Sequence, residues 1–201
     1  PTTARRALES GAWESVKPGD PRLDRAEFRI VARPQASLEA AARLAEAQGI
    51  ETVILSDRFE GEAREVGREM AARARDILER SRSIRPPCLL LSGGETTVTV
   101  RGDGCGGRNA EFLLAFGIAL GRCESVYALS GDTDGVDGMA PVAGALWRPD
   151  TLARAAARGL NPQLFLDAND AHGFFGALGD SVVTGPTLTN VNDFRAVLLL
   201  G

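Results

Sequence analysis

From residue 27 onward, apolar and polar positions alternate in a regular order that predicts a layered α/β domain. Apolar residues recur at helical spacing after Ser37 and again between Gly61 and about Arg80, which predicts two helices. Three short apolar runs predict strands around these helices: residues 28–31, 52–55 and 88–91. This β-α-β-α-β order is typical of a sheet with helices packed on it.

The segment after residue 91 departs from this order. Thr and Val alternate from Thr96 to Arg101, and only Gly93, Gly94 and Glu95 separate them from the preceding strand. A short link with two glycines predicts a hairpin, and therefore a sheet that contains an antiparallel pair. The following elements are a glycine-rich loop at 102–107, helices at 108–120 and 150–159, and strands at 126–129, 181–183 and 196–200. Between the helix at 150–159 and the strand at 181–183, one further helix opens at Asn161, and another opens at Asn169 or Asp170 and ends at Gly179. We predict a three-layer α/β sandwich with a mixed, mainly parallel sheet flanked by helices.

Residues 1–26 have a different character from the rest of the chain. Pro1, Pro18, Gly19 and Pro21 lie among charged residues, beside a short helical pattern at 3–10. This composition predicts a linker or arm, followed by a single α/β domain at 27–201. Because the chain begins with Pro1 and not with Met, we interpret it as a processed chain or a piece of a longer protein.

Composition and charge exclude several classes of protein. A hydrophobic fraction of 44% with 25% charged residues is ordinary for a globular chain, and the net charge of −4 argues against a general binder of nucleic acid or of anionic membranes. No apolar run approaches the ~20 residues of a membrane span. Cys88, Cys105 and Cys123 lack the spacing of a disulfide scaffold or a metal site, which favours a reduced cytoplasmic setting. Lys17 is the only lysine and lies in the linker, so we expect no catalytic lysine in this chain.

The glycine-rich loop at 102–107 is the first candidate binding site. It contains G-x-G-x-x-G and ends in Gly106 and Gly107, and Arg108 and Asn109 follow on the first turn of a helix. Free backbone N–H groups at that turn, together with the Arg108 guanidinium, would bind a phosphate or carboxylate. The hairpin before the loop argues against a dinucleotide site of the Rossmann type. The alternative is a flexible turn with a surface arginine.

An acidic loop follows the strand at 126–129. Asp132, Asp134 and Asp137 place three carboxylates within six residues, with Thr133 among them. Carboxylates just beyond a buried strand suit Mg²⁺, which is usually held by one or two carboxylates and the phosphates of a substrate. The register is not that of an EF-hand. An acidic turn without a metal is the alternative.

Three further features carry weaker signals. Gly93 and Gly94, before Glu95 and Thr96, would let a ligand approach the backbone closely, or simply form a turn. A long polar loop at 184–193 separates two apolar strands. His172 is the only histidine, and we expect it to be a structural hydrogen-bonding residue.

Taken together, four motifs resemble the MOFRL family, the C-terminal portion of glycerate 2-kinases. In order they are S-G-G-E-T-T-V at 92–98, G-G-R-N-x-E at 106–111, G-D-T-D-G-x-D-G at 131–138 and T-G-P-T-x-T-N-V-N-D at 184–193. The resemblance extends over about 88–198, and residues 28–80 resemble the stretch just upstream in the same enzymes. Some members carry the older label of hydroxypyruvate reductase, in tartrate degradation clusters.

The resemblance implies transfer of a phosphoryl group from ATP, with Mg²⁺, to the 2-hydroxyl of D-glycerate in a cleft between two domains. It implies that an N-terminal domain with the catalytic lysine is missing here, so this chain would form one wall of the cleft and be inactive alone. Arg108 matches the functional arginine of the family, for the substrate carboxylate or the transferring phosphate. Asp132 and Asp134 are the candidates for metal binding or for orienting the hydroxyl. The remaining candidates for substrate or phosphate binding are Gly93, Gly94, Glu95, Thr96, Gly106, Gly107, Asn109, Glu111, Thr133, Asn190 and Asn192.

Two other functions stay open from the sequence. An NAD(P)H-dependent hydroxypyruvate reductase would use the G-x-G-x-x-G loop, with His172 as its one ordinary proton donor. A non-catalytic domain that binds acidic metabolites would need neither ATP nor NAD(P)H. The sequence does not fix the oligomeric state, and a homodimer stays open.

Overall fold

The computed structural model describes residues 1–80 and 83–201 and divides into two compact units, Pro1–Val31 and Ala32–Gly201. The first unit contains helix α1 (Thr2–Ser10) and the 3-10 helix η1 (Pro21–Leu23). Within residues 1–31, all of which the structure describes, only Ala7 is buried. This unit therefore has no hydrophobic core of its own.

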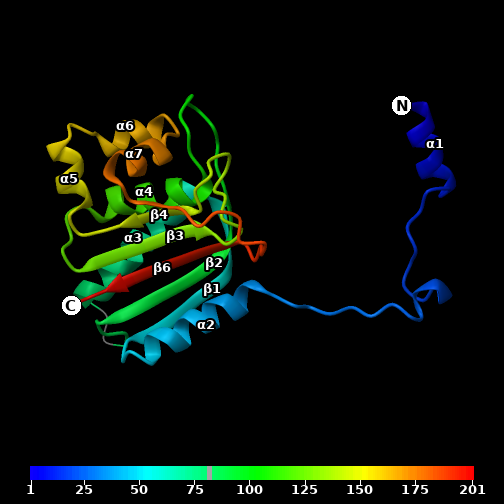
Figure 1. The fold of residues 1–201 in the computed structure, drawn as a ribbon, viewed down its shortest axis with the longest axis horizontal. Coiled ribbons are helices and arrows are strands. Elements are labelled where there is room, and N and C mark those ends of the chain that lie inside the picture. Colours follow the sequence, from blue (N-terminus) through cyan, green and yellow to red (C-terminus); the bar gives the residue numbers. More distant parts are fainter. Residues whose placement is uncertain (81–82) are drawn as a thin grey trace. The chain divides into compact units, whose positions relative to one another are not determined.

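The second unit is built around a six-stranded sheet with the order β1-β2-β6-β3-β4-β5 (Figure 1). Its strands are β1 (Glu51–Glu62), β2 (Cys88–Thr97), β3 (Val126–Asp132), β4 (Gly144–Trp147), β5 (Ser181–Val182) and β6 (Asp193–Leu199). Among the strands that the structure describes, only the β1–β2 pairing is parallel, and the four other pairings are antiparallel. The prediction of a mixed sheet with flanking helices is confirmed, but the sheet is mostly antiparallel and the prediction of a mainly parallel one is wrong. The error arose because β6 inserts between β2 and β3, and strand order cannot be read from a single sequence.

The predicted hairpin at residues 93–95 is also wrong. β2 continues through Gly93 and Gly94 to Thr97, paired with β1 on one side and β6 on the other. Gly94 has φ 133°, and a Cβ there would lie 2.1 Å from the carbonyl oxygen of Phe59 on β1. The glycine therefore permits close approach of two paired strands, where β1 shifts its register, and forms no turn.

Other boundaries differ in smaller ways. Residues 28–31 form no strand, although their pattern predicts one. The strand β4 was not predicted, because it is only four residues long and follows a loop rich in glycine and proline. The predicted strand at 52–55 is the first part of a longer β1.

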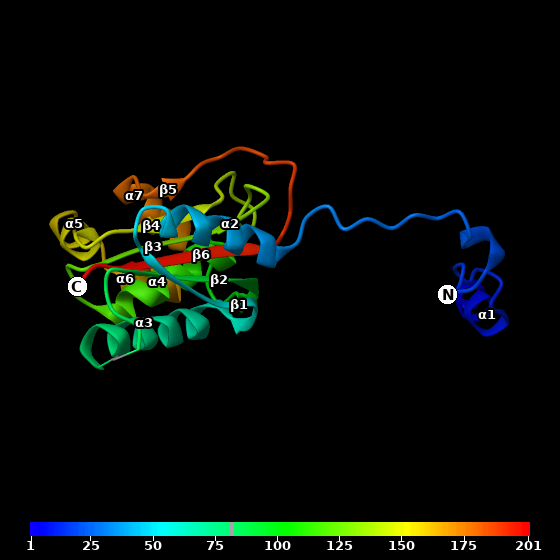
Figure 2. The same ribbon diagram turned by 90° about the horizontal axis from the view of Figure 1, so that it is seen from below.

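Helices cover both faces of the sheet (Figure 2). On one face lies α2 (Pro34–Glu46), whose Leu38 and Ala42 pack on Leu91 of β2. On the other face lie α3 (Ala63–Arg80) and α4 (Arg108–Leu120), which form most of the core together with Trp147 of β4. Three short helices complete this side: α5 (Thr151–Ala157), α6 (Pro162–Asp167) and α7 (Ala171–Leu178). The predicted helices are confirmed to within a few residues.

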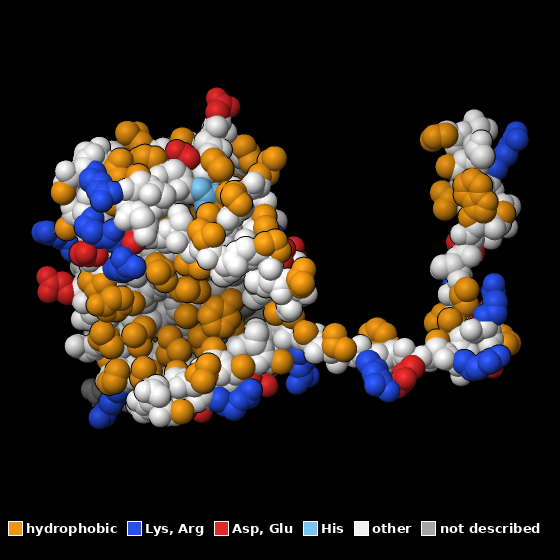
Figure 3. Space-filling view, in the orientation of Figure 1, with side chains coloured by type: hydrophobic (Ala, Val, Ile, Leu, Met, Phe, Trp, Pro, Cys, Tyr) orange, Lys and Arg blue, Asp and Glu red, His pale blue; other side chains and the backbone are white. Residues whose placement is uncertain are grey.

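The face that carries α2 is covered only in part. Beyond the helix, apolar side chains lie open over β6, β3 and β4 (Figure 3), including Tyr127, Leu129, Leu146 and Leu198. Throughout the described ranges, the helices are too short or too polar to cross a bilayer.

Strand register brings two carboxylates and a glycine together at one end of three neighbouring strands. Asp193, the first residue of β6, lies opposite Gly94 on β2 and opposite Asp132 at the end of β3. The ends of β2 and β3 and the start of β6 thus meet at a single point.

Candidate functional site

Arg108, the first residue of α4, projects into this meeting point. Its Nε donates to Oδ1 of Asp193 at 2.7 Å and its Nη2 donates to Oδ2 of Asp132 at 2.6 Å. Both carboxylates are buried, whereas the Arg108 side chain is 25% exposed. The third nitrogen, Nη1, lies 3.8 Å from Oε1 of the exposed Glu95. Two buried anions therefore fix the guanidinium, and its third nitrogen lies beside an exposed carboxylate.

Electrostatics keeps this guanidinium charged. Burial alone would lower the pKa of Arg108, but the hydrogen bond to Asp193 and the charges of Asp193, Asp132 and Glu95 outweigh it and raise the pKa. Burial raises the pKa of Asp132 to about 6, against the backbone N–H of Asp134 and the charge of Arg108, which lower it. At neutral pH, Arg108 and Asp132 form an ion pair.

Asp193 is the buried centre of the cluster. Asn109 Nδ2 donates to its Oδ1 at 2.7 Å, and Arg195 Nη2 donates to its Oδ2 at 2.5 Å. Arg195 is wholly buried, with its guanidinium carbon 4.8 Å from the centroid of the Phe112 ring, and burial lowers its pKa. Neither Asp193 nor Arg195 was among the predicted site residues. A signal was present, because the two charges share the inward face of β6 with Val197 and Leu199.

The N-terminus of α4 is already occupied by a carboxylate of the same chain. Asp137 is completely buried and accepts from the backbone N–H of Asn109 at 3.0 Å and of Ala110 at 2.9 Å. A Cβ at Gly107 would lie 2.3 Å from the Asp137 carboxyl carbon, so the glycine makes this cap possible. The expectation of free backbone N–H groups here is corrected, and the Arg108 side chain remains as the group that can meet a ligand anion.

Backbone N–H groups of the glycine-rich loop also donate to other residues of the same chain. The N–H of Gly104 donates to the carbonyl of Ala168 at 2.9 Å, and that of Cys105 donates to Oδ1 of Asp170 at 3.1 Å. Asn169 Oδ1 accepts from the N–H of Gly102 at 3.0 Å. Three backbone donors of the loop are therefore bound to the residues just before α7 and are not free for a ligand.

The carboxylates of the acidic loop do not suit a metal ion in this arrangement. The two oxygens of Asp132 accept from Arg108 and from the N–H of Asp134. Asp134 accepts from the N–H of Val136 at 2.8 Å and from Asn190 Nδ2 at 3.2 Å. Across residues 1–80 and 83–201, no group of three or more His, Cys, Asp or Glu is placed to hold a metal. The cation beside Asp132 is the guanidinium of Arg108, so Mg²⁺ does not fit between Asp132 and Asp134 here.

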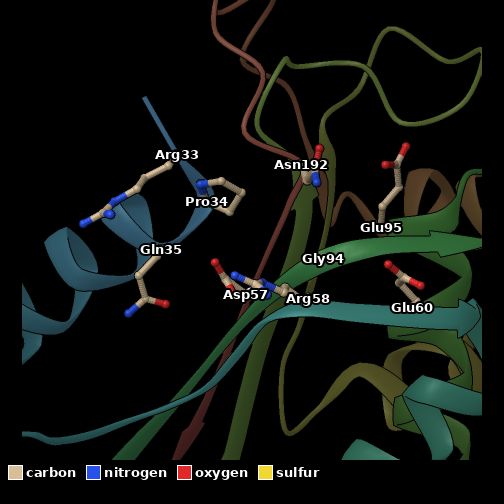
Figure 4. Close-up of a pocket in the computed structure, with 9 residues that line it drawn as sticks. All are labelled: Arg33, Pro34, Gln35, Asp57, Arg58, Glu60, Gly94, Glu95 and Asn192. Atoms are coloured by element: carbon tan, nitrogen blue, oxygen red, sulfur yellow. Dashed lines mark ion pairs between the residues drawn. The ribbon is translucent and has the colours of Figure 1, made fainter. Parts of the chain in front are cut away.

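Two cavities lie at this part of the molecule, one bordered by Arg108 and the other by its neighbour Glu95. The larger, of about 600 Å³, lies between the start of α2, the bulged part of β1 and the end of β2 (Figure 4). Glu95 and Asn192 stand on one side of it, and Arg33 and Gln35 on the other. Its remaining lining residues are Pro34, Asp57, Arg58, Glu60 and Gly94. Of these nine, the sequence had singled out only Gly94, Glu95 and Asn192.

The smaller cavity, of about 270 Å³, lies between the end of β2 and the glycine-rich loop. It is lined by Thr96, Val98, Val100, Gly104, Gly106, Gly107, Arg108, Glu111, Gly138 and Asn169. Glu111 is buried in its wall, where it accepts from Arg64 Nε at 2.8 Å and from Asn169 Nδ2 at 2.8 Å. Arg108 borders this cavity and Glu95 borders the larger one, so their contact joins the two.

The other predicted residues lie behind these cavities. Asn109 is buried beneath Arg108, and its Oδ1 accepts from Ser130 Oγ at 2.7 Å. Gly93 pairs with Phe194 inside the sheet. Thr133 donates to the carbonyl of Asn192 at 2.8 Å, which ties the acidic loop to the loop at 184–193. Asn109, Gly93 and Thr133 therefore support the site but line neither cavity.

Comparison with known proteins decides the family. A family model described as the MOFRL family matches residues 88–193, more than half of the chain. The chain belongs to the MOFRL family. The match contains Arg108, Asp132 and Asp193, so the cluster described above lies within the family's own region.

Relatives of this MOFRL chain carry two kinds of name. A "putative hydroxypyruvate reductase" of Agrobacterium vitis is 46% identical over 99% of this chain and 45% of its own length. A "D-glycerate 2-kinase" of Thermotoga maritima is 36% identical over 89% of this chain and 43% of its own length. The crystal structure of a glycerate kinase from Thermotoga maritima matches with a TM-score of 0.84 and 32% identity, over 98% of this chain and 50% of that chain. This chain thus spans about half the length of the curated relatives it matches.

Proposed function

We propose that this chain is the C-terminal portion of an ATP-dependent D-glycerate 2-kinase and forms one wall of its active-site cleft. The observation that carries the proposal is the Arg108 guanidinium, which Asp193 and Asp132 fix at the border of the 270 Å³ cavity. The names of the relatives from Thermotoga maritima support a glycerate kinase. Because the match covers about half of each relative, the remaining parts of the cleft, including the lysine that the family resemblance implies, belong to a portion outside this chain.

In this proposal, Arg108 binds the anionic group of the reaction. D-glycerate carries a carboxylate and the transferring phosphoryl group is also anionic, and a guanidinium binds either in a bidentate fork. Its position is fixed before any ligand arrives, so little free energy is lost in orienting it. The 270 Å³ cavity beside Arg108 has room for a three-carbon hydroxy acid, since a water molecule takes about 30 Å³ in the liquid.

Asp132 and Asp134 have supporting roles here. Asp132 holds Arg108 in place and partly neutralises it, which tunes its attraction for a second anion. Asp134 orients the polar loop at 184–193 through Asn190, and this loop supplies Asn192 to the rim of the larger cavity. Glu95, Gly94 and Thr96 complete the edge of β2 between the two cavities. ATP is the phosphoryl donor in this proposal, and no step is assigned to Mg²⁺, because the carboxylates of this chain do not fit it.

The test is an assay of ADP release with D-glycerate and Mg-ATP on two proteins. One is this chain, and the other is the completed protein, in which the portion of the Agrobacterium vitis relative that the chain does not match is joined ahead of it. We expect turnover in the completed protein and none in the chain alone, because half of a cleft cannot position both substrates. Absence of ADP release from a folded completed protein would contradict the proposal.

A second candidate is a hydroxypyruvate reductase, favoured by the names of the Agrobacterium vitis relatives. Against it, three N–H groups of the G-x-G-x-x-G loop, those of Gly102, Gly104 and Cys105, are bound to residues 168–170, and the start of α4 is capped by Asp137. Fluorescence titration with NADH separates the two: saturable binding and oxidation of NADH with hydroxypyruvate would establish the reductase. A domain that binds acidic metabolites without turnover would bind glycerate but release no ADP even in the completed protein.

A further inference from the structure

Residues 27–31 have the pattern of a strand but lie in no strand. Glu27 and Arg29 form an ion pair, with Arg29 Nη2 2.7 Å from Glu27 Oε1, so these alternate residues share one polar face. Phe28 and Ile30 alternate with them and are 88% and 70% exposed, and Val31 is 94% exposed. Apart from Val31, which lies on the same side as the two charges, the segment thus has one face with paired charges and one apolar face that is exposed.

The sheet of this chain cannot take the segment in the usual way. Its outer strands are β1 and the two-residue β5, and the segment reaches β1 through α2. About 98% of crossovers between parallel strands are right-handed, and right-handed crossovers over opposite faces of a sheet run in opposite directions across it. Helices α2 and α3 lie on opposite faces of the sheet (Figure 2). The crossover through α3 leads from β1 to its neighbour β2. A right-handed crossover through α2 that ends at β1 would therefore have to start from a strand on the β2 side of β1. β2 and β6 already fill that side.

We propose that residues 27–31 are an added strand for a second sheet, which lies in the portion of the longer relatives that this chain does not match. The Agrobacterium vitis relative matches 99% of this chain, the segment included, and has more than half of its length outside the match. The partner is an unpaired strand edge beside an apolar surface that receives Phe28 and Ile30, while Glu27 and Arg29 face solvent. This inference does not depend on which reaction the protein catalyses.

Hydrogen–deuterium exchange of the backbone tests the pairing. In the 201-residue chain, we expect the amides of residues 28–31 to exchange within seconds, because these residues lie in no helix or strand. In the completed protein, we expect loss of this fast exchange. Leu8→Ser, which changes an exposed apolar residue of the same unit outside the segment, is the matched control and should leave the protection unchanged. Equally fast exchange in both proteins, with the amides of β2 and β6 protected in each, would overturn the proposal.

Two neighbouring proline substitutions test the same pairing by stability. Successive N–H groups of a strand point to opposite sides, so Arg29→Pro and Ile30→Pro remove donors on opposite sides. In the completed protein, we expect at least one of them to lower the melting temperature, and in the 201-residue chain neither. If both are tolerated in the completed protein, the segment is not hydrogen-bonded to a sheet and the proposal fails.

Experiments on the 201-residue chain alone test independently which surface covers Phe28 and Ile30. The double substitution Phe28→Ser and Ile30→Ser should leave its unfolding curve unchanged and, in analytical ultracentrifugation, its sedimentation unchanged. A clear loss of stability would mean that the segment packs on this chain's own sheet. Dissociation of a dimer by the double substitution would mean that a second copy covers it. Either result would overturn the assignment to the unmatched portion.

Discussion

Asp193 and Arg108 are 85 residues apart in the chain, and their side chains meet at 2.7 Å, with the carboxylate fully buried. The same carboxylate accepts from Arg195, so one anion is shared by two guanidinium groups, of which only Arg108 reaches the surface. Arg195 compensates the charge of Asp193 from inside the sheet, and Arg108 is thereby fixed as the group that faces a ligand.

Removal of Asp193 should destabilise the fold strongly. Asp193→Ala leaves the buried Arg195 without its anion, and breaking a buried ion pair in this way costs about 3–5 kcal/mol. Asp193→Asn keeps the shape and one acceptor oxygen, so its cost should be smaller. Urea unfolding followed by circular dichroism measures both. The exposed Asp103→Ala is the control, with a change within about 0.5 kcal/mol. Equal stability of Asp193→Ala and the control would contradict the pairing.

Asp137 should stabilise the folded state more than an ordinary surface carboxylate does. Asp137→Ala removes the acceptor of two backbone N–H groups at the start of α4, and loss of a helix cap costs about 0.5–2 kcal/mol. Asp137→Asn retains one acceptor oxygen and should cost less. The unfolding free energies of the two variants check this order, and the reverse order would show that the cap is not the reason for the burial of Asp137.

Gly94 should tolerate no side chain. In Gly94→Ala, the new Cβ would overlap the backbone of Phe59 at a φ of 133°, so we expect a loss of at least about 3 kcal/mol or failure to fold. The matched control is Gly176→Ala in α7, where the nearest atom to the new Cβ is 4.0 Å away and alanine favours the helix. Thermal unfolding compares the two. A folded Gly94→Ala protein with unchanged melting temperature would mean that β1 and β2 are not packed as described.

Asp132 should titrate near pH 6. Its pKa in the folded protein is raised from 3.8 to about 6, so the folded state holds a proton that the unfolded state releases between these values. This group therefore lowers stability as the pH rises from about 4 to about 6 and adds no further change above that. Carboxyl ¹³C NMR measures the midpoint, with Asp132→Asn to assign the signal. Arg108→Ala should raise the midpoint further, because the guanidinium lowers this pKa. A midpoint near 4 would contradict the burial of Asp132.

How far the sequence predicts this structure depends on the range of the interactions. Helices α3 and α4 were predicted within two residues, because helical periodicity and the flanking glycines are local signals. The hairpin at 93–95 was predicted wrongly, because a glycine pair can serve a turn or a close approach of strands, and only the neighbour Phe59 decides between them. The four motifs identified candidate residues, but not which role each one has. That Arg108 pairs with Asp132 and Asp193 and that Asp137 caps α4 depends on contacts between residues 24 to 85 positions apart in the sequence. Residues 28–31 form no strand although they alternate like one, because a strand also needs a paired neighbour, which a local pattern does not reveal.

The most direct test of the central claim is a steady-state comparison of Arg108→Ala, Arg108→Lys and Arg73→Ala in the completed protein, with D-glycerate and Mg-ATP. Arg73 is an exposed arginine of α3, and its replacement should leave kcat/KM unchanged. We predict that Arg108→Ala lowers kcat/KM by about 10²–10³-fold, the effect of removing one positioned donor from a transition state. The variant should be less stable but still folded, because Asp193 keeps its second partner, Arg195, and circular dichroism checks this. Arg108→Lys should recover only part of the loss, because an ammonium cannot replace the fork held by Asp193 and Asp132. If Arg108→Ala turns over glycerate as fast as Arg73→Ala, Arg108 does not bind the reacting anion and the proposed site is wrong.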